Sequence, residues 1–112
     1  MLPLTEQTFV ASTETRQALS PQECQELLLQ LPNGWQLQFV PTPRLVANFE
    51  CEGFVGALSG AQKITALAEA ENHHPELLLN YGKITVTWWS HDLNGLHTND
   101  FIMALRTSKS LQ

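Results

Sequence analysis

The segment Lys83–His91 is the strongest strand signal in this chain. From residue 84 it reads Ile-Thr-Val-Thr-Trp-Trp-Ser-His, and such a run of β-branched and aromatic residues is typical of a β-strand. Successive side chains of a strand point to opposite faces. One face therefore carries Ile84, Val86, Trp88 and Ser90, and the other carries Thr85, Thr87, Trp89 and His91. Any fold of this chain has to place these two different faces in a sheet.

Three more segments predict strands. Trp35–Val40 alternates, with Trp35, Leu37 and Phe39 on one face. After the turn at residues 41–43, Leu45–Cys51 is predicted to return as the second strand of an antiparallel hairpin. Leu77–Tyr81 precedes the strong strand, and only Gly82 separates the two. Four strands are therefore expected, in two sequence-adjacent pairs.

Three segments predict helices. Ser20-Pro21-Gln22-Glu23 has the pattern of a capping box and begins a short amphipathic helix, which ends at the turn residues 32–34. A longer helix is predicted from Phe54 to about Glu71, and we expect Pro75 to stop it. Gly53, Gly56 and Gly60 lower its helix propensity but allow another element to pack closely. Its apolar stripe contains Phe54, Val55, Leu58, Ala61, Ile64 and Ala68. A last helix is predicted to begin near Thr98, with Thr98 as its cap and Asp100 in its first turn.

This order of elements, α-β-β-α-β-β-α, predicts the α+β fold class. We expect a four-stranded antiparallel sheet with three helices packed on one face. Residues 1–19 lack a regular apolar period and are expected to form a loosely structured N-terminal arm. Residues 20–112 are then a single domain. Because a four-stranded sheet has edges that can pair with a second copy, a homodimer or homotetramer is expected.

Charge and composition exclude several function classes. The net charge of −5 gives no electrostatic footprint for nucleic acid or for an anionic membrane surface. The apolar runs are too short for a membrane span, and no signal peptide is recognised, so a cytoplasmic location is expected. Cys24 and Cys51 lack the spacing of a disulfide framework or a metal motif and are predicted to be reduced structural thiols.

The residues that can do acid and base chemistry lie where the predicted elements end. His73 and His74 stand at the exit of the long helix, His91 at the end of the strongest strand, and Asp100 at the start of the last helix. Glu69 lies four residues before His73, so it can orient that imidazole. His97 has no obvious partner. Histidine is the side chain that gains or loses a proton near neutral pH.

Two other chemistries compete with acid and base catalysis. Three histidines and a carboxylate can hold zinc, but a helical zinc site favours two histidines four residues apart rather than adjacent ones. A serine or cysteine nucleophile lacks a motif and a neighbouring histidine. Metal-free proton transfer remains, with tryptophan beside it as a wall for a flat, uncharged heterocycle.

The spacing of these residues resembles the full signature of the pterin-4a-carbinolamine dehydratase family. The signature positions are Glu69, His73-His74-Pro75, Tyr81, His91 and Asp100. The segments Asn80–Lys83, Val86–His91 and Asn99–Ile102 look like the bacterial branch of that family. The resemblance covers the chain from about Ser20 to its end.

The resemblance implies dehydration of a 4a-hydroxytetrahydropterin to the quinonoid dihydropterin, without a cofactor or metal. That step recycles tetrahydropterin for an aromatic amino acid hydroxylase. It also implies that His73 and His91 are the acid and base, that His74 holds the pterin and assists, and that Glu69 and Asp100 orient the histidines or the ring. The further substrate-binding positions are Asn72, Pro75, Trp89, Ser90 and Asp92.

Two positions depart from the animal members of the family. Asn72 stands where they have an aspartate, and Asn99 stands where they have an arginine, which makes the rim of the pocket less charged. The animal members also act in transcription as dimerisation cofactors of homeodomain factors, and nothing in this sequence supports that role. The alternative function is a non-catalytic dimerisation or assembly scaffold of the same fold, in which the three histidines would be free to change.

Overall fold

A single antiparallel sheet forms one layer of the protein, in a computed structural model that describes residues 2–11 and 16–112. The strands are β1 (Gln36–Gln38), β2 (Arg44–Glu50), β3 (Glu76–Asn80) and β4 (Lys83–Trp88), in the spatial order β1-β2-β4-β3. The predicted sheet is confirmed, with the strong strand β4 at its centre, paired with β2 on one side and β3 on the other.

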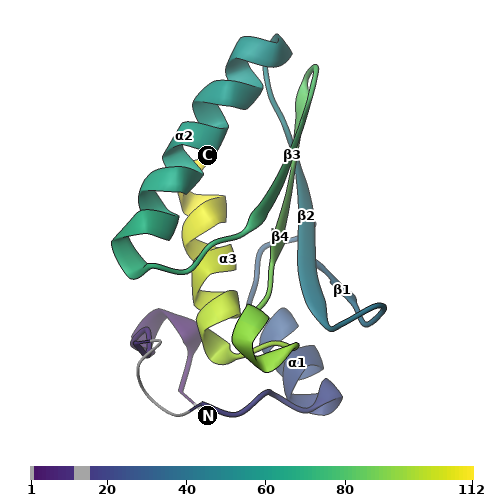
Figure 1. Ribbon diagram of the computed structural model, residues 1–112, viewed down its shortest axis with the longest axis vertical. Coiled ribbons are helices and arrows are strands. Elements are labelled where there is room, and N and C mark those ends of the chain that lie inside the picture. The colour runs from purple at the N-terminus through teal and green to yellow at the C-terminus, as the bar shows by residue number, and fades with distance from the viewer. Residues whose placement is uncertain (1, 12–15) are drawn as a thin grey trace.

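The helices form the second layer (Figure 1). They are α1 (Pro21–Leu28), α2 (Gly53–Glu71) and α3 (Thr98–Ser110). Two short 3-10 turns are also present: η1 (Leu4–Glu6) precedes α1, and η2 (His91–Leu93) lies between β4 and α3. The long helix α2 packs on β3 and β4, α3 packs on β2 and β4, and α1 packs beside β1 and α3. The α+β fold class is therefore confirmed.

The core lies between the sheet and the helices. The inward faces of β2 and β4 contribute Leu45, Ala47, Ile84, Val86 and Trp88, which are at most 3% exposed. The alternation predicted for β4 is thus confirmed. A Cβ atom at Gly60 of α2 would lie 2.5 Å from the Cδ1 atom of Ile84, so the glycine allows the helix to approach the sheet closely.

The apolar stripe expected on α2 is wrong for its first turns. Ala57, Ala61, Ile64 and Ala68 are buried, whereas Phe54, Val55 and Leu58 are 51%, 81% and 49% exposed. The periodic pattern correctly predicted the helix. It could not tell which apolar residues face this sheet, because those of the first turns lie on a side that no described element covers.

Two predicted strands are too long. β1 ends at Gln38, and Phe39 is exposed rather than on a buried face with Trp35. β4 ends at Trp88, because Ser90 pairs with Gly95 in an isolated bridge and the chain then enters η2. His91 therefore lies in a 3-10 turn rather than on the strand.

The expectation of a loose arm does not hold for the described residues of segment 1–19. Leu4 is buried, and its amide donates to Oε1 of Gln30. The backbone of Val10 exchanges two hydrogen bonds with the side-chain amide of Asn99, which is 1% exposed. The amide of Leu19 donates to the carbonyl oxygen of Leu96 at 2.7 Å. The segment is fastened across the N-terminal end of α3 by polar contacts that its irregular sequence does not reveal.

Candidate active site

His73 and His74 are positioned by the way α2 ends. The helix stops at Glu71, and Asn72 adopts the left-handed conformation with φ 50° and ψ 44°. The amide of His73 donates to the carbonyl oxygen of Ala68, and that of Asn72 donates to Glu69, which is the Schellman arrangement. Pro75 was expected to stop the helix. Asn72 does so three residues earlier, because asparagine tolerates this conformation.

The His73 imidazole is held in place on three sides. Its Nε2 atom lies 2.6 Å from Oδ1 of Asp100. The ring stacks on Trp88, with ring centroids 5.6 Å apart and planes 12° apart. The Phe9 ring packs against it edge to face, with ring centroids 5.7 Å apart. Its side chain is 11% exposed, so the ring is fixed while one part of it reaches the surface.

Asp100 supports His73 from behind and is itself 0% exposed. Its Oδ2 atom accepts a hydrogen bond from the Ser90 hydroxyl at 2.8 Å and another from the amide of His97 at 3.0 Å. Ser90 was expected to line the site but is also fully buried. Neither residue reaches the surface, so Asp100 and Ser90 support the His73 ring from inside the protein.

Glu69 pairs with His74 and not with His73, which corrects the expectation from helical spacing. Its Oε2 atom meets Nε2 of His74. The left-handed turn at Asn72 takes the chain out of the helix before either histidine, so the rule that residues four apart share a helical face does not apply. The side chains of His74 and Glu69 are 53% and 66% exposed, which places this pair at the rim.

His91 stacks on Trp89. The sequence had placed these two residues on the same face of the predicted strand. The ring centroids are 4.2 Å apart and the planes are 23° apart. The guanidinium carbon of Arg44 lies 4.0 Å from the Trp89 ring centroid, and one ring face cannot hold both groups, so Trp89 lies between them. The Nε2 atom of His91 lies 3.3 Å from the carbonyl oxygen of His74, which joins η2 to the loop after α2.

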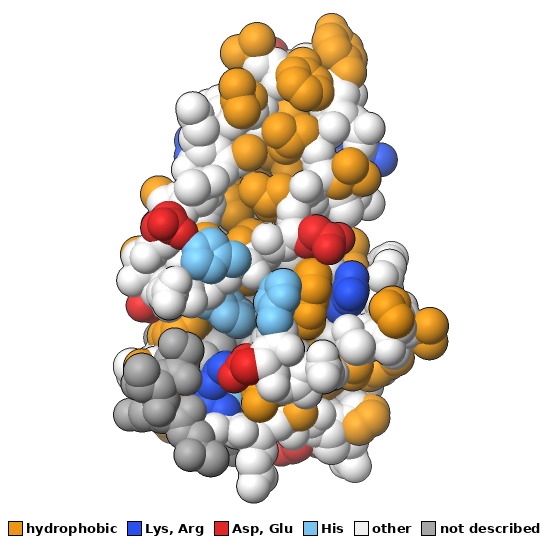
Figure 2. All heavy atoms as spheres, in the orientation of Figure 1, with side chains coloured by type: hydrophobic (Ala, Val, Ile, Leu, Met, Phe, Trp, Pro, Cys, Tyr) orange, Lys and Arg blue, Asp and Glu red, His pale blue; other side chains and the backbone are white. Residues whose placement is uncertain are grey.

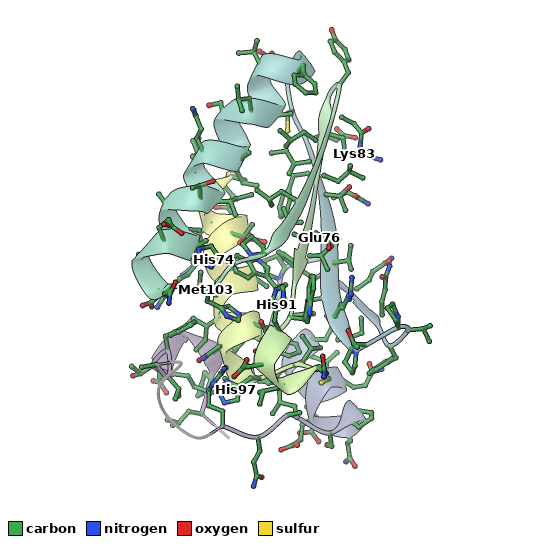
Figure 3. The ribbon with its side chains drawn as sticks, in the orientation of Figure 1. His74, Glu76, Lys83, His91, His97 and Met103 are labelled. Atoms are coloured by element: carbon green, nitrogen blue, oxygen red, sulfur yellow. The ribbon has the colours of Figure 1, made fainter. Side chains whose placement is uncertain are left out.

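A pocket of about 430 Å³ lies among these side chains. Figure 2 shows the histidine side chains gathered around a hollow in this face of the molecule, and in Figure 3 His74 and His91 lie close together while His97 stands apart from them. The lining residues are Arg16, Asn72, His73, His74, His91 and Asp92. The structure therefore brings the three predicted catalytic histidines together, along with Asn72 and Asp92. Pro75 and Trp89 do not line this pocket.

Arg16 is the lining residue that the sequence did not predict. Its Nη2 atom lies 2.6 Å from Oδ2 of Asp92, and its side chain is 3% exposed. No sequence pattern points to Arg16, because it lies in the irregular segment 1–19. Only the tertiary structure brings that segment next to η2.

The three imidazoles share one feature that decides how they can move protons. In each ring Nε2 faces an oxygen atom, from Asp100 for His73, from Glu69 for His74 and from a backbone carbonyl for His91. Carboxylate and carbonyl oxygens only accept hydrogen bonds, so Nε2 carries the proton when the ring is neutral. In the neutral ring Nδ1 is then the nitrogen with a free lone pair, which can accept a proton.

Two ionisable groups beside the histidines have shifted pKa values. Burial by itself raises the pKa of Asp92, but the hydrogen bond and charge of Arg16 outweigh it and lower that pKa. Burial, and next the Arg16 charge, lower the pKa of His97. Further along the chain, burial and then the nearby charges of Glu23 and Asp100 raise the pKa of Cys24 to about 11, consistent with a structural thiol.

His97 has a structural role, which corrects the expectation that it lacks a partner. Its Nδ1 atom accepts a hydrogen bond from the amide of Asn99, and its own amide donates to Asp100. His97, rather than Thr98, is thus the N-cap of α3.

Among the described residues, no group of three or more His, Cys, Asp and Glu side chains could hold a metal ion. The zinc alternative therefore has no ligand set in that part of the chain.

Residues 17–110 match the family model described as pterin 4 alpha carbinolamine dehydratase. The chain belongs to this family. A relative from Vibrio vulnificus is 44% identical over 96 residues, which cover 85% of this chain and 86% of that protein. One from Chlorobium luteolum is 40% identical over 103 residues, covering 92% and 90%. Both are named, provisionally, as pterin-4-alpha-carbinolamine dehydratases.

Solved structures of dehydratase-like proteins have the same fold. A transcriptional coactivator/pterin dehydratase from Brucella melitensis superposes with a TM-score of 0.76 at 27% identity, covering 85% of this chain and 99% of that one. A pterin dehydratase-like protein identified as a RuBisCO assembly factor in the alpha-carboxysome superposes with a TM-score of 0.59 at 19% identity, covering 70% and 90%. The second likeness concerns the fold alone. In the described part of this chain, no helix has the length and apolar character to cross a membrane.

Proposed function

We propose that this protein dehydrates a 4a-hydroxytetrahydropterin to the quinonoid dihydropterin by histidine acid and base catalysis. The observation that carries the proposal is the convergence of His73, His74 and His91 on one pocket, each with Nε2 tethered to an oxygen atom. The family of the chain and the names of its relatives point to the same reaction. A pocket of about 430 Å³ is of the size that small-molecule sites have.

The reaction needs one proton delivered and one removed. A protonated imidazole gives its proton to the 4a-hydroxyl oxygen, the C4a–O bond breaks, and its electron pair leaves with the oxygen as water. The lone pair of N5 forms a double bond to C4a, and a ring N–H proton passes to a second, neutral imidazole. Imidazoles suit both steps at neutral pH because their unperturbed pKa is about 6.5.

We assign these two roles to His73 and His91, with His74 holding the ring. His73 is the better fixed of the two, since it is stacked on Trp88 and bonded to a fully buried carboxylate. A carboxylate behind an imidazole fixes its orientation and stabilises the imidazolium that forms. His74 lies at the rim with Glu69, where it can contact the substrate without being enclosed.

The test is the reaction of an aromatic amino acid hydroxylase, which releases the 4a-carbinolamine. Adding the purified chain should hasten the disappearance of the carbinolamine absorbance. His73→Ala and His91→Ala should each lower kcat by about 10²–10⁴, the usual contribution of an acid or base. His97→Asn is the matched control, because it removes a histidine that does not line the pocket and keeps a side chain that can cap α3.

Failure to accelerate the reaction with folded protein would refute the proposal. In that case the alternative, an assembly scaffold of the same fold, becomes the better description. Two features favour the enzyme: all three histidines are present, and His73 and His91 are each stacked on a tryptophan. A scaffold has no need to hold imidazoles in this way.

We also propose that the chain forms a homo-oligomer. Phe54, Val55, Leu58, Leu78 and Tyr81 are each at least 49% exposed, and Figure 2 shows hydrophobic side chains gathered over the upper parts of α2 and β3. Exposed apolar patches mark interaction sites, and the edge strand β3 can pair with another copy. Sedimentation or light scattering should give two or four copies, and a monomer at micromolar concentration would contradict this.

For the proposed dehydration, the physiological source of the substrate is an aromatic amino acid hydroxylase.

A further inference from the structure

Arg16 is a buried cation with unmet hydrogen-bonding capacity. Its side chain is 3% exposed, although its backbone is partly accessible. Nη2 meets Asp92, but Nε and Nη1 are buried and have no hydrogen-bond partner among the described residues. No other buried side-chain nitrogen or oxygen atom of the described residues lacks a hydrogen-bond partner.

Anchoring the N-terminal segment does not account for this arrangement. The carboxylate of Asp92 is 57% exposed, and an ion pair with such a solvated partner adds little to the stability of a protein. A buried donor left without an acceptor loses its hydrogen bonds to water and gains none in return, and the loss is larger on a charged group. The segment is already held by Val10 and Leu19, so a buried arginine is a costly addition unless something else accepts its hydrogen bonds.

The position of Arg16 indicates what that acceptor is. The residue lines the same pocket as His73, His74 and His91, so a ligand bound there can bring oxygen atoms to the guanidinium. An arginine prefers oxygen acceptors that carry negative or partial negative charge. Because Asp92 neutralises the positive charge locally, a neutral carbonyl oxygen is as suitable as an anion.

We propose that Arg16 is a substrate-binding residue that donates hydrogen bonds to the ring carbonyl oxygen of the pterin. This assignment rests on the proposed function for the choice of ligand. The pterin ring carries its carbonyl at C4, next to the reacting carbon C4a, so a donor fixed at that oxygen orients C4a toward the histidines. Arg16 lies one residue outside the family match, which begins at residue 17. Its assignment therefore rests on the structure of this chain and not on the family.

The test compares two stable ligands that differ at this oxygen. A fully oxidised pterin has the C4 carbonyl, whereas the matching 2,4-diaminopteridine has an amino group in its place and offers no oxygen acceptor. Binding of both to the full chain can be followed by ligand fluorescence. We expect the wild-type protein to bind the carbonyl compound about tenfold or more tightly, the range of one well-placed hydrogen bond to a charged group.

Variants of Arg16 assign the preference to this side chain. Arg16→Met should bind the carbonyl compound about tenfold more weakly and lose the preference, while Arg16→Lys should keep part of it. In turnover, Arg16→Met should raise KM by a larger factor than it lowers kcat, because the hydrogen bond is made in the ground state and the transition state alike. Arg106→Met is the control. It removes an arginine from a similar ion pair, 2.7 Å from Glu71, outside the pocket, and should leave the preference intact.

Two results would overturn the assignment. The first is equal binding of both ligands by the wild-type protein, which would mean that the guanidinium of Arg16 does not bond to the ring carbonyl oxygen. The second is a folded Arg16→Met protein that keeps the preference. The wild-type comparison needs no variant, so the proposal stays testable even if Arg16→Met does not fold. Absence of dehydratase activity with a clear carbonyl preference would refute the proposed reaction but support this binding role.

Discussion

Asp100→Asn is the substitution that tests the proposed catalytic arrangement most directly. The carboxylate accepts three hydrogen bonds, from His73 on Oδ1 and from Ser90 and the His97 amide on Oδ2. Asparagine has the same shape but one acceptor oxygen. If that oxygen keeps the two bonds at Oδ2, the amide NH₂ faces Nε2 of His73, where a proton now resides.

Two donors cannot bond to each other, so His73 must change. Either it loses its partner, or its proton moves to Nδ1 and Nε2 accepts from the amide. In the second state Nδ1 no longer accepts a proton, and an imidazolium has lost the carboxylate that stabilises it. We therefore expect kcat to fall by about 10²–10⁴, the full contribution of an acid or base.

The same change should lower stability by a smaller and separable amount. Losing one charge-assisted hydrogen bond costs roughly 1.5–3 kcal/mol, and losing a negative charge in the first turn of α3 costs about 0.3–1 kcal/mol. The sum is about 2–4 kcal/mol of unfolding free energy, which is roughly 8–16 °C in Tm for a chain of this size. Folded protein should thus remain at assay temperature.

Ser90→Ala is the matched control for this substitution. It removes one hydrogen bond from the same buried carboxylate but keeps the charge and the bond to His73. It should lower the unfolding free energy by about 1–2 kcal/mol and kcat by less than tenfold. Wild-type kcat in folded Asp100→Asn protein, or an equal loss of kcat in both variants, would refute the reasoning. Denaturant unfolding and the carbinolamine assay measure the two quantities separately.

Three further predictions concern the elements around the site. Asn72→Gly should leave the unfolding free energy unchanged or raised, whereas Asn72→Ala should lower it by about 1 kcal/mol, because alanine resists the left-handed conformation; equal stability of the two variants in urea would contradict the role of Asn72 as the helix stop. Pro75→Ala should leave kcat near that of the wild type, since Asn72 already ends α2, and a large loss would show that Pro75 fixes the histidine loop. Burial, and next the Arg16 charge, hold the pKa of His97 below its usual value, so the unfolded chain takes up the proton first, and stability should fall as the pH drops below about 6.5. His97→Asn should flatten that acid-side loss when unfolding curves of the two proteins are compared, and parallel curves would mean that His97 does not contribute.

The sequence was most informative where a local pattern has one physical meaning. The alternation along 83–91 predicted the central strand, and the capping box at Ser20 and Glu23 predicted the start of α1, with both reciprocal hydrogen bonds present. The pair Trp89 and His91 was correctly placed together, because the backbone of Ser90 between them is still extended and His91 is the first residue of η2.

Long-range partners were where the sequence was least informative. Glu69 was assigned to His73 by helical spacing, yet it pairs with His74 because the chain leaves the helix at Asn72. His97 had no predicted partner, since its cap interaction depends on the start of α3 being one residue earlier than expected. The exposed Phe54 and Leu58 show that an apolar stripe predicts a helix better than it predicts burial.

The sequence by itself determined the fold class and the resemblance to one family. Alternation, capping and turn residues act over a few positions, and the spacing of Glu69, His73, His74, His91 and Asp100 already resembled that of one enzyme family. Only the tertiary structure decided how these groups are connected: which carboxylate supports which imidazole, and that Arg16 from the N-terminal segment lines the pocket. Those contacts join residues up to 76 positions apart, and no local pattern records which distant side chain will meet a buried charge.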